Sequence, residues 1–361
     1  MGERTATLPR AWLAALVAIA VLESALRLAV PADEFPVRED IRTSAAFLRV
    51  LQADGPAEIA FVGASLTERG VVIPRISKRV DTRAGRSVHI ANYGHPDAQA
   101  EFVEDVVFAL MKGEPPPRLV LYGVSPMQLN RDLRAESTSE IWRLEDLPRK
   151  FDQHGMGVLD EVPQVLQNEL KLALRMVQLR HDQTAWYRRL VHGRAFPKTG
   201  QRGGHYHLTP GSRTNLIARP PTLKTQGYHT MKRRMQESIV DGRWVYSERL
   251  LGHMKGVAKL CRDNGADLVY FEIPFHDTLR TLMADNTYVD FYDVMAEVAD
   301  ETGFPFVRVS QLGVTLTEMH YADGAHLNLE GARAMSAPVT HQLVLPALNR
   351  AAQPKAAHGA L

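Results

Sequence analysis

Two short stretches near opposite ends of the chain carry the residue types of a serine enzyme. The first is Gly63-Ala-Ser65, which follows the apolar run of residues 59–62. The second is Asp323-Gly-Ala-His326. A serine hydroxyl becomes a strong nucleophile only when an imidazole accepts its proton, and a carboxylate orients that imidazole. We therefore predict that Ser65 is a nucleophile, that His326 is its general base and that Asp323 orients His326.

Both stretches must lie on the same side of a sheet if these groups are to meet. Five runs rich in Ile, Val, Leu, Phe and Tyr alternate with helix-like segments, which indicates a parallel sheet with helices on both faces. Ser65 follows the first strand, and His326 precedes the last helix, so both are expected at the carboxyl ends of the strands, where open α/β sheets bind ligands. The predicted strands are residues 57–63, 87–92, 118–124, 267–273 and 304–309, and the predicted helices are residues 41–52, 98–112, 163–179, 247–264, 288–302 and 329–344, the last with a kink at Pro338.

The strands are interrupted by a long segment without regular periodicity, so the α/β domain is expected in two parts. Segments of this kind are usually functional or disordered, and we interpret this one as an insertion that covers one side of the crevice. The predicted organisation is an N-terminal membrane anchor or signal (1–32), a linker and helix (33–56), the first part of the α/β domain (57–130), the insertion (131–244), the second part (245–350) and a disordered tail (351–361).

The insertion is strongly basic. Residues 180–243 contain thirteen Lys and Arg and three Asp and Glu, a net +10, whereas the formal net charge of the whole chain is +2. One interpretation is a solvated loop, and the other is a surface that meets anionic lipid headgroups or an anionic glycan. No nucleic-acid partner is expected, because no nucleic-acid-reading module occurs in the sequence.

Composition excludes several other kinds of site. The chain has 361 residues, of which 45% are hydrophobic and 23% charged, as in ordinary globular proteins. Cys261 is the only cysteine, so neither an internal disulfide nor a cysteine zinc site supports the fold. The sequence has no Walker loop, no Gly-x-Gly-x-x-Gly and no His-Glu-x-x-His motif, and we expect no cofactor.

The N-terminus has the character of a membrane segment. Residues 11–30 are long enough to span a bilayer core at about 1.5 Å per residue. Glu23 and Arg27 interrupt the apolar run, but they lie one helical turn apart near one end and can pair there. Arg4 and Arg10 precede the segment, whereas acidic residues follow it, so the positive-inside rule places the N-terminus in the cytoplasm.

This arrangement predicts a single-pass protein of the bacterial cytoplasmic membrane with its catalytic domain outside the cytoplasm. Two alternatives stay open: a cleaved signal peptide, which would yield a secreted protein, and a soluble or interfacial helix.

The candidate site stretches, taken together and in this order, resemble the SGNH (GDSL-like) hydrolase superfamily. Gly63-Ala-Ser65-Leu-Thr is similar to its first block, Asn92-Tyr-Gly94 to its second and Asp323-Gly-Ala-His326-Leu-Asn to its last, while Tyr122-Gly-Val-Ser125-Pro occupies the place of the third. The resemblance covers residues 57–130 and 245–344. It implies a flavodoxin-like three-layer α/β/α sandwich, a Ser65–His326–Asp323 triad and an oxyanion hole that includes the Gly94 amide.

The third block departs from the pattern of the superfamily. That block usually supplies an asparagine to the oxyanion hole, and Ser125-Pro126 stands here instead. Either the backbone amides of Ser65 and Gly94 suffice, or Ser125 or Asn130 substitutes for the asparagine. The membrane-anchored branch that works on cell-surface polymers, which includes the DltD-like proteins, shares the looser third block and an N-terminal anchor.

Each candidate residue also has a purely structural interpretation. Ser65 can cap a helix, Asp323 can be a turn residue, and His326 can be a hydrogen-bonded core histidine. Gly94 can be a turn glycine, and Asn92 and Ser125 can bond only to neighbouring backbone. Of the residues outside the blocks, Glu272 and His276 can line the crevice, whereas His205 and His207 lack a third ligand for a metal site.

We predict a membrane-anchored, extracytoplasmic esterase or O-acyltransferase that works through an acyl-Ser65 intermediate. Its expected substrates are acyl groups of a cell-envelope glycan or a small ester. One alternative is a scaffold of the same fold that binds a glycan or a membrane acyltransferase partner without catalysis, and another is a secreted esterase.

Overall fold

The computed structural model describes two separate units of the chain. One unit comprises Met1–Arg49 and Ser139–Arg202, and the other comprises Val50–Thr138 and Gly203–Leu361. The described residues are Val21, Ser24, 57–95, 98–130, Leu144, 147–163, 165–166, Arg233, Gln236, 239–322 and 324–352.

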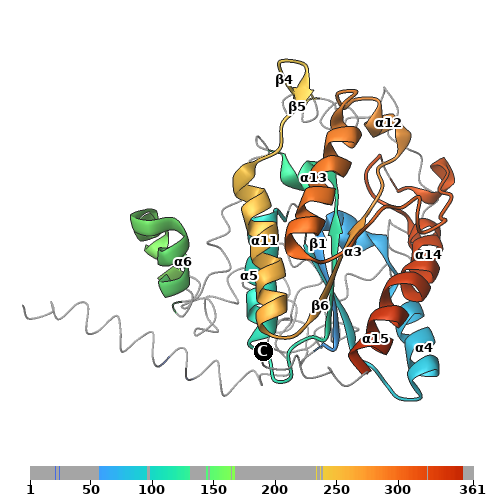
Figure 1. The fold of residues 1–361 in the computed structure, drawn as a ribbon, viewed down its shortest axis with the longest axis horizontal. Helices are drawn as coiled ribbons and strands as arrows, with labels where there is room; N and C mark the ends of the chain where they lie inside the picture. The colour runs from blue at the N-terminus through green and yellow to red at the C-terminus, as the bar shows by residue number, and fades with distance from the viewer. Residues whose placement is uncertain are drawn as a thin grey trace, which may run out of the picture. The chain divides into compact units, whose positions relative to one another are not determined.

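A five-stranded parallel sheet forms the centre of the second unit (Figure 1). Its spatial order is β2-β1-β3-β6-β7, which is the flavodoxin-like order once the five strands are counted along the chain. The strands are β1 (Ile59–Ala64), β2 (Ile90–His95), β3 (Leu119–Val124), β6 (Asp267–Glu272) and β7 (Phe306–Val307). The predicted parallel five-stranded sheet is therefore confirmed.

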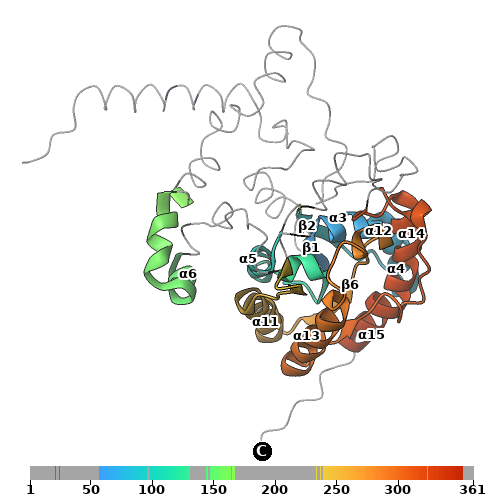
Figure 2. The same ribbon diagram turned by 90° about the horizontal axis from the view of Figure 1, so that it is seen from above.

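Helices cover both faces of this sheet, which confirms the three-layer prediction (Figures 1 and 2). The helices α5 (Ala100–Met111), α11 (Glu248–Asp263) and α13 (Thr287–Thr302) pack side by side on one face. The other face carries α4 (Ile73–Ala84), α14 (Leu329–Pro338) and α15 (Leu345–Ala352). Because helices bury both faces, β1, β2 and β3 are buried along their whole length.

The predicted bounds of the second and fifth strands were wrong, and two helices were not predicted. The fifth strand, β7, covers only Phe306–Val307 of the predicted 304–309. The second strand runs from Ile90 to His95, three residues beyond its predicted start and end. The segment between β1 and β2 contains two helices that were not predicted, α3 (Ser65–Gly70) and α4. Ile73, Ile76 and Val80 form the buried stripe of α4, at the spacing of an amphipathic helix.

The C-terminal helical segment changes its winding at the predicted kink. A π-helical stretch, η8 (Val339–Val344), follows Pro338 and joins α14 to α15. Proline cannot donate the hydrogen bond of a regular α-helix, so a local change of winding is expected there.

The segments on either side of the predicted insertion meet at one place on the second unit. Asn130 and Tyr246 form an antiparallel bridge, and the Ser247 amide donates to the Leu129 carbonyl at 2.9 Å. Just before this point lies a short hairpin, β4 (Ile239–Val240) and β5 (Arg243–Trp244).

Within the other unit, the described residues of the insertion include α6 (Leu147–His154) and η5 (Gly155–Glu161). Among the described residues, no helix is both long and apolar enough to cross a membrane. The predicted anchor at 11–30 lies outside the described residues except for Val21 and Ser24, and the predicted helix at 41–52 lies entirely outside them. Of the predicted helix at 163–179, only Pro163, Val165 and Leu166 are described.

Candidate active site

Ser65 is the first residue of α3, directly beyond the carboxyl end of β1. The turn between the two elements depends on Gly63, whose φ of +144° lies in the region that favours glycine. A Cβ atom on Gly63 would lie 2.6 Å from the Gly123 carbonyl oxygen and 2.1 Å from Thr67 Oγ1. The absence of that Cβ lets α3 start immediately above the sheet, with Ser65 partly exposed.

His326 lies against Ser65, although 261 positions separate them in the sequence. The distance from His326 Nε2 to Ser65 Oγ is 2.9 Å, which is within hydrogen-bond range. When the imidazole carries its proton on Nδ1, Nε2 accepts from the serine hydroxyl, which is the geometry that general-base catalysis requires. The structure therefore brings together the predicted nucleophile and the predicted base.

The loop that carries His326 is held by Asn328. The Asn328 side chain caps α14 by accepting from the Gly331 amide at 3.0 Å, and its Nδ2 donates to the Met319 carbonyl at 2.7 Å. From the other side, the amide of His276 donates to the Gly324 carbonyl at 3.0 Å. These bonds fix the backbone on both sides of the imidazole.

Asp323, the predicted third member of the triad, lies outside the described residues.

Asn92 and Gly94 bond to each other and to α3. Asn92 Nδ2 donates to the carbonyls of Thr67 and Glu68 at 3.1 and 3.2 Å, and Asn92 Oδ1 accepts from the Gly94 amide at 2.9 Å. A Cβ on Gly94 would lie 2.4 Å from the Glu68 amide nitrogen, so glycine is needed for α3 to approach β2. The Gly94 amide, expected in the oxyanion hole, is thus already bonded to Asn92. The hydrogen bonds of the Asn92 side chain hold α3 against β2.

Ser125 and Asn130 are also committed to structural bonds. Ser125 is fully buried and forms a capping box with Gln128 at the start of η2 (Pro126–Leu129). Asn130 is equally buried, and its Nδ2 donates to the Val245 carbonyl at 3.2 Å, where the chain returns from the insertion. Both side chains are buried and take part in bonds within the fold, which weighs against both proposed substitutes for the missing asparagine.

Glu68 is a buried carboxylic residue close to Ser65 in the sequence, and the sequence analysis did not single it out. It lies on α3 one turn after Ser65, and only 6% of its surface is exposed. Its Oε2 atom has no hydrogen-bond partner among the described residues. Burial raises the pKa of the Glu68 carboxyl to about 7, although the positive charge of Arg69 acts in the opposite direction. In the sequence, the only sign that could have drawn attention to Glu68 was its position three residues after the candidate nucleophile Ser65.

Glu272 and His276 have structural contacts of their own. Glu272 is buried and accepts from Tyr292 Oη at 3.1 Å and from the Val309 amide at 3.0 Å, and burial is the main reason why the pKa of its carboxyl is raised. His276 Nδ1 accepts from the Thr278 amide at 3.1 Å and so caps α12 (Asp277–Arg280).

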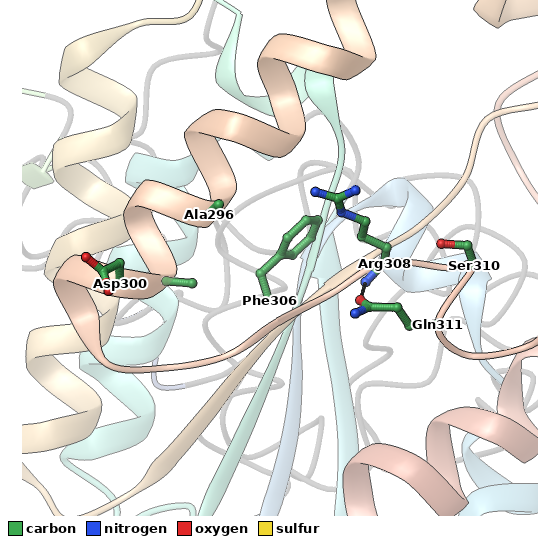
Figure 3. Close-up of a pocket in the computed structure, with 7 residues that line it drawn as sticks. Ala296, Asp300, Phe306, Arg308, Ser310 and Gln311 are labelled. Atoms are coloured by element: carbon green, nitrogen blue, oxygen red, sulfur yellow. Dashed lines mark hydrogen bonds between the residues drawn. The ribbon is translucent and has the colours of Figure 1, made fainter.

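An open hollow of about 490 Å³ lies beside α13 and β7 (Figure 3). Arg308 and Gln311 line one side of it, and the Arg308 amide donates to Gln311 Oε1 at 2.7 Å. None of the predicted site residues lines this hollow.

Within the described ranges, no group of three or more His, Cys, Asp or Glu residues is arranged to hold a metal ion. The pair His205 and His207 lies outside those ranges.

Comparison with known proteins gives little further information. No protein-family model and no curated protein matches the chain. Among solved structures, a putative acylhydrolase from Bacteroides fragilis has 13% identity and a TM-score of 0.35, and the match covers 87% of this chain and 97% of that one. A variant of Axe2, an acetyl-xylooligosaccharide esterase from Geobacillus, has 10% identity and a TM-score of 0.34, and the match covers 80% of this chain and 95% of that one. Similarity at this level provides no basis for assigning an activity.

Proposed function

We propose that this protein is a serine ester hydrolase or O-acyltransferase in which Ser65 is the nucleophile. The observation that carries the proposal is the 2.9 Å contact between Ser65 Oγ and His326 Nε2 at the carboxyl end of β1. Ser65 Oγ attacks the ester carbonyl while His326 takes the hydroxyl proton, and the same proton then goes to the departing alcohol. Water or a sugar hydroxyl afterwards takes the acyl group from Ser65. In this proposal Asp323 orients His326.

The finer parts of the function are also proposals. The apolar segment at 11–30 supports attachment to the membrane with the catalytic domain outside the cytoplasm, and the net +10 of residues 180–243 supports an anionic cell-envelope glycan as acyl donor or acceptor.

The test replaces Ser65 with Ala in the full chain and measures hydrolysis of 4-nitrophenyl acetate. Loss of a triad member lowers kcat by about 10⁴-fold or more in well-studied serine enzymes, so S65A is expected to show almost no turnover. S310A is the matched control, because Ser310 is exposed and far from Ser65 in the sheet order, beyond β7. Equal turnover by the wild type and S65A would exclude the serine mechanism.

A scaffold without catalysis is the second candidate function. The observation in its favour is that Gly94, Ser125 and Asn130 all have their polar groups bonded elsewhere. A fluorophosphonate probe separates the two candidates, because it reacts only with an activated serine. Labelling of wild type but not of S65A supports the enzyme, and absence of labelling supports the scaffold.

A further inference from the structure

The hollow beside α13 has the size and the lining of a small-ligand site. Its volume of about 490 Å³ falls within the range of roughly 300–1,000 Å³ that is usual for such sites. Ala296 and Phe306 contribute apolar surface to it. Asp300, Arg308 and Gln311 contribute polar groups. Apolar surface combined with a few polar groups both binds a small molecule and fixes its orientation.

The Arg308 side chain is held in place, and its charge stays available. Its guanidinium carbon lies 4.1 Å from the centre of the Tyr292 ring, so the cation rests on an aromatic face. Within the part of the chain that the structure describes, this guanidinium forms no ion pair. The nearby Glu272 carboxyl is already bonded to Tyr292 Oη and to the Val309 amide. A planar guanidinium binds a carboxylate through two parallel hydrogen bonds, so Arg308 is suited to a carboxylate ligand.

Phe306 and Gln311 supply the other contacts that a sugar ring needs. Phe306 is half-buried, and its ring lies 5.7 Å from the ring of Phe291, centre to centre. Figure 3 shows the Phe306 ring between Ala296 and the Arg308 side chain. Gln311 Oε1 accepts from the Arg308 amide at 2.7 Å, which leaves the Nε2 group as a donor. An aromatic face beside fixed polar groups suits a sugar ring, which has C–H groups on its faces and hydroxyls around its edge.

The charges at the hollow favour a ligand with a single negative group there. Of the described residues that line the hollow, Arg308 is the only cation. Asp300, exposed on the last turns of α13, also lines it. The Asp300 carboxylate can accept hydrogen bonds from sugar hydroxyls, but it repels a second negative charge. A carboxylate, which carries one charge, therefore fits better than a phosphate, which carries up to two.

We propose that this hollow binds a carboxylated sugar, a uronate unit of an acidic glycan, at a site separate from Ser65. The carboxylate pairs with the Arg308 guanidinium, and the sugar ring lies on Phe306. Hydroxyls of the sugar bond to Gln311 and Asp300. The choice of a glycan rests on the proposed function, but the binding itself does not use Ser65.

The hollow lies on the same edge of the sheet as the candidate active site. Arg308 directly follows β7 and Ser65 directly follows β1, so both residues lie at the carboxyl ends of parallel strands. Three strand spacings separate β1 from β7, which corresponds to about 15 Å. A glycan chain held at Arg308 can therefore extend toward Ser65, and the hollow would retain the polymer while an acyl group on another unit reacts.

The test is calorimetric titration of the full chain with tetragalacturonate, an oligosaccharide of uronate units, at physiological ionic strength. The parent protein for the titrations is S65A, so that no turnover contributes heat. R308M removes the positive charge and keeps an unbranched side chain, and it is expected to weaken binding at least about tenfold. A296F places a ring in the hollow without removing a polar group, and an equal or larger loss of affinity is expected.

Two control variants and one control ligand match these changes. V289F adds the same ring to α13 at Val289, which is 61% exposed and does not line the hollow. R83M removes one positive charge from the exposed end of α4. Both controls are expected to bind tetragalacturonate as tightly as the parent does. Methyl-esterified tetragalacturonate has the same hydroxyls without the charge, and the parent is expected to bind it at least about tenfold more weakly.

The proposal is overturned if tetragalacturonate does not bind, if R308M or A296F binds it as tightly as the controls do, or if the methyl ester binds equally well. Binding that persists in R308M and A296F would mean that the oligosaccharide lies elsewhere, for example on the basic segment at 180–243.

Fluorophosphonate labelling of the wild type separates this failure from failure of the proposed function. If Ser65 is labelled and R308M still binds tetragalacturonate as the controls do, only the role of the hollow is wrong. If Ser65 is not labelled and binding depends on Arg308, the hollow is a glycan site and the proposed function is wrong.

Discussion

The buried carboxyl of Glu68 makes the stability of the fold depend on pH in an unusual direction. Its pKa is raised from 4.5 to about 7, chiefly by burial. Between these two pH values the native state holds a proton that the unfolded state has lost. Unfolding therefore releases a proton, and the free energy of unfolding falls as the pH rises from about 4.5 to 7. Below this window both states are protonated and the effect is absent.

The magnitude follows from the difference between the two pKa values. One pKa unit corresponds to about 1.4 kcal/mol, so a change from 4.5 to about 7 corresponds to roughly 3 kcal/mol. Glu68→Gln removes the titrating group and keeps the size of the side chain. Relative to wild type, E68Q is therefore expected to gain roughly 3 kcal/mol of stability on going from pH 4 to pH 8.

Urea denaturation of both proteins across this pH range measures the effect. Trp244 is 3% exposed in the unit that contains the sheet, so its fluorescence reports unfolding of that unit. E297Q serves as the control, because Glu297 is exposed on α13. A stability difference between E68Q and wild type that stays constant from pH 4 to pH 8 would refute the assigned burial and pKa of Glu68.

Two further predictions concern the geometry around Ser65. N328A removes the cap of α14 and the bond to Met319, so it is expected to destabilise the fold by about 1–2 kcal/mol and to lower kcat at least tenfold by releasing His326. The control N264A alters an exposed bond at the end of α11 and should leave kcat unchanged. An equal effect of both variants on kcat would argue against a positioning role for Asn328. G63A forces a Cβ against Thr67 and the Gly123 carbonyl, so it is expected to cost more than about 3 kcal/mol in thermal or urea unfolding. G313A, at φ +63° with nothing within 4 Å of its Cβ, should cost only about 1 kcal/mol, and equal costs would contradict the close packing described for α3.

The sheet was predictable where apolar residues form an unbroken run. Strands β1 and β3 are such runs because helices bury both faces of the sheet, and β6 is one apart from Asp267 and Glu272 at its ends. Their observed bounds differ little from the predicted ones. Strand β2 was placed three residues too early, because Asn92 is polar and resembles a strand end. Its side chain is buried only because the carbonyls of α3 bond to it, and a single sequence does not show that contact.

The pairing of Ser65 with His326 was also predictable, because both residues were expected at the carboxyl ends of the parallel strands. The oxyanion donors could not be predicted in the same way. Whether the Gly94 amide is free depends on Asn92, two residues away on the same strand, and whether Ser125 is free depends on the turn of η2. Glu68 was overlooked for a related reason: in sequence it resembles an exposed glutamate of a helix, but the packing of α3 against its neighbours leaves it only 6% exposed.

The most direct measurement of the central claim is the mass of the peptide that contains Ser65 after treatment of the full chain with a fluorophosphonate. The Ser65–His326 contact predicts one phosphonyl adduct on Ser65 in the wild type, strongly reduced labelling in H326A, and no labelling at that peptide in S65A. A wild-type protein that remains unlabelled, or one that is labelled at Ser65 equally well without His326, would contradict it.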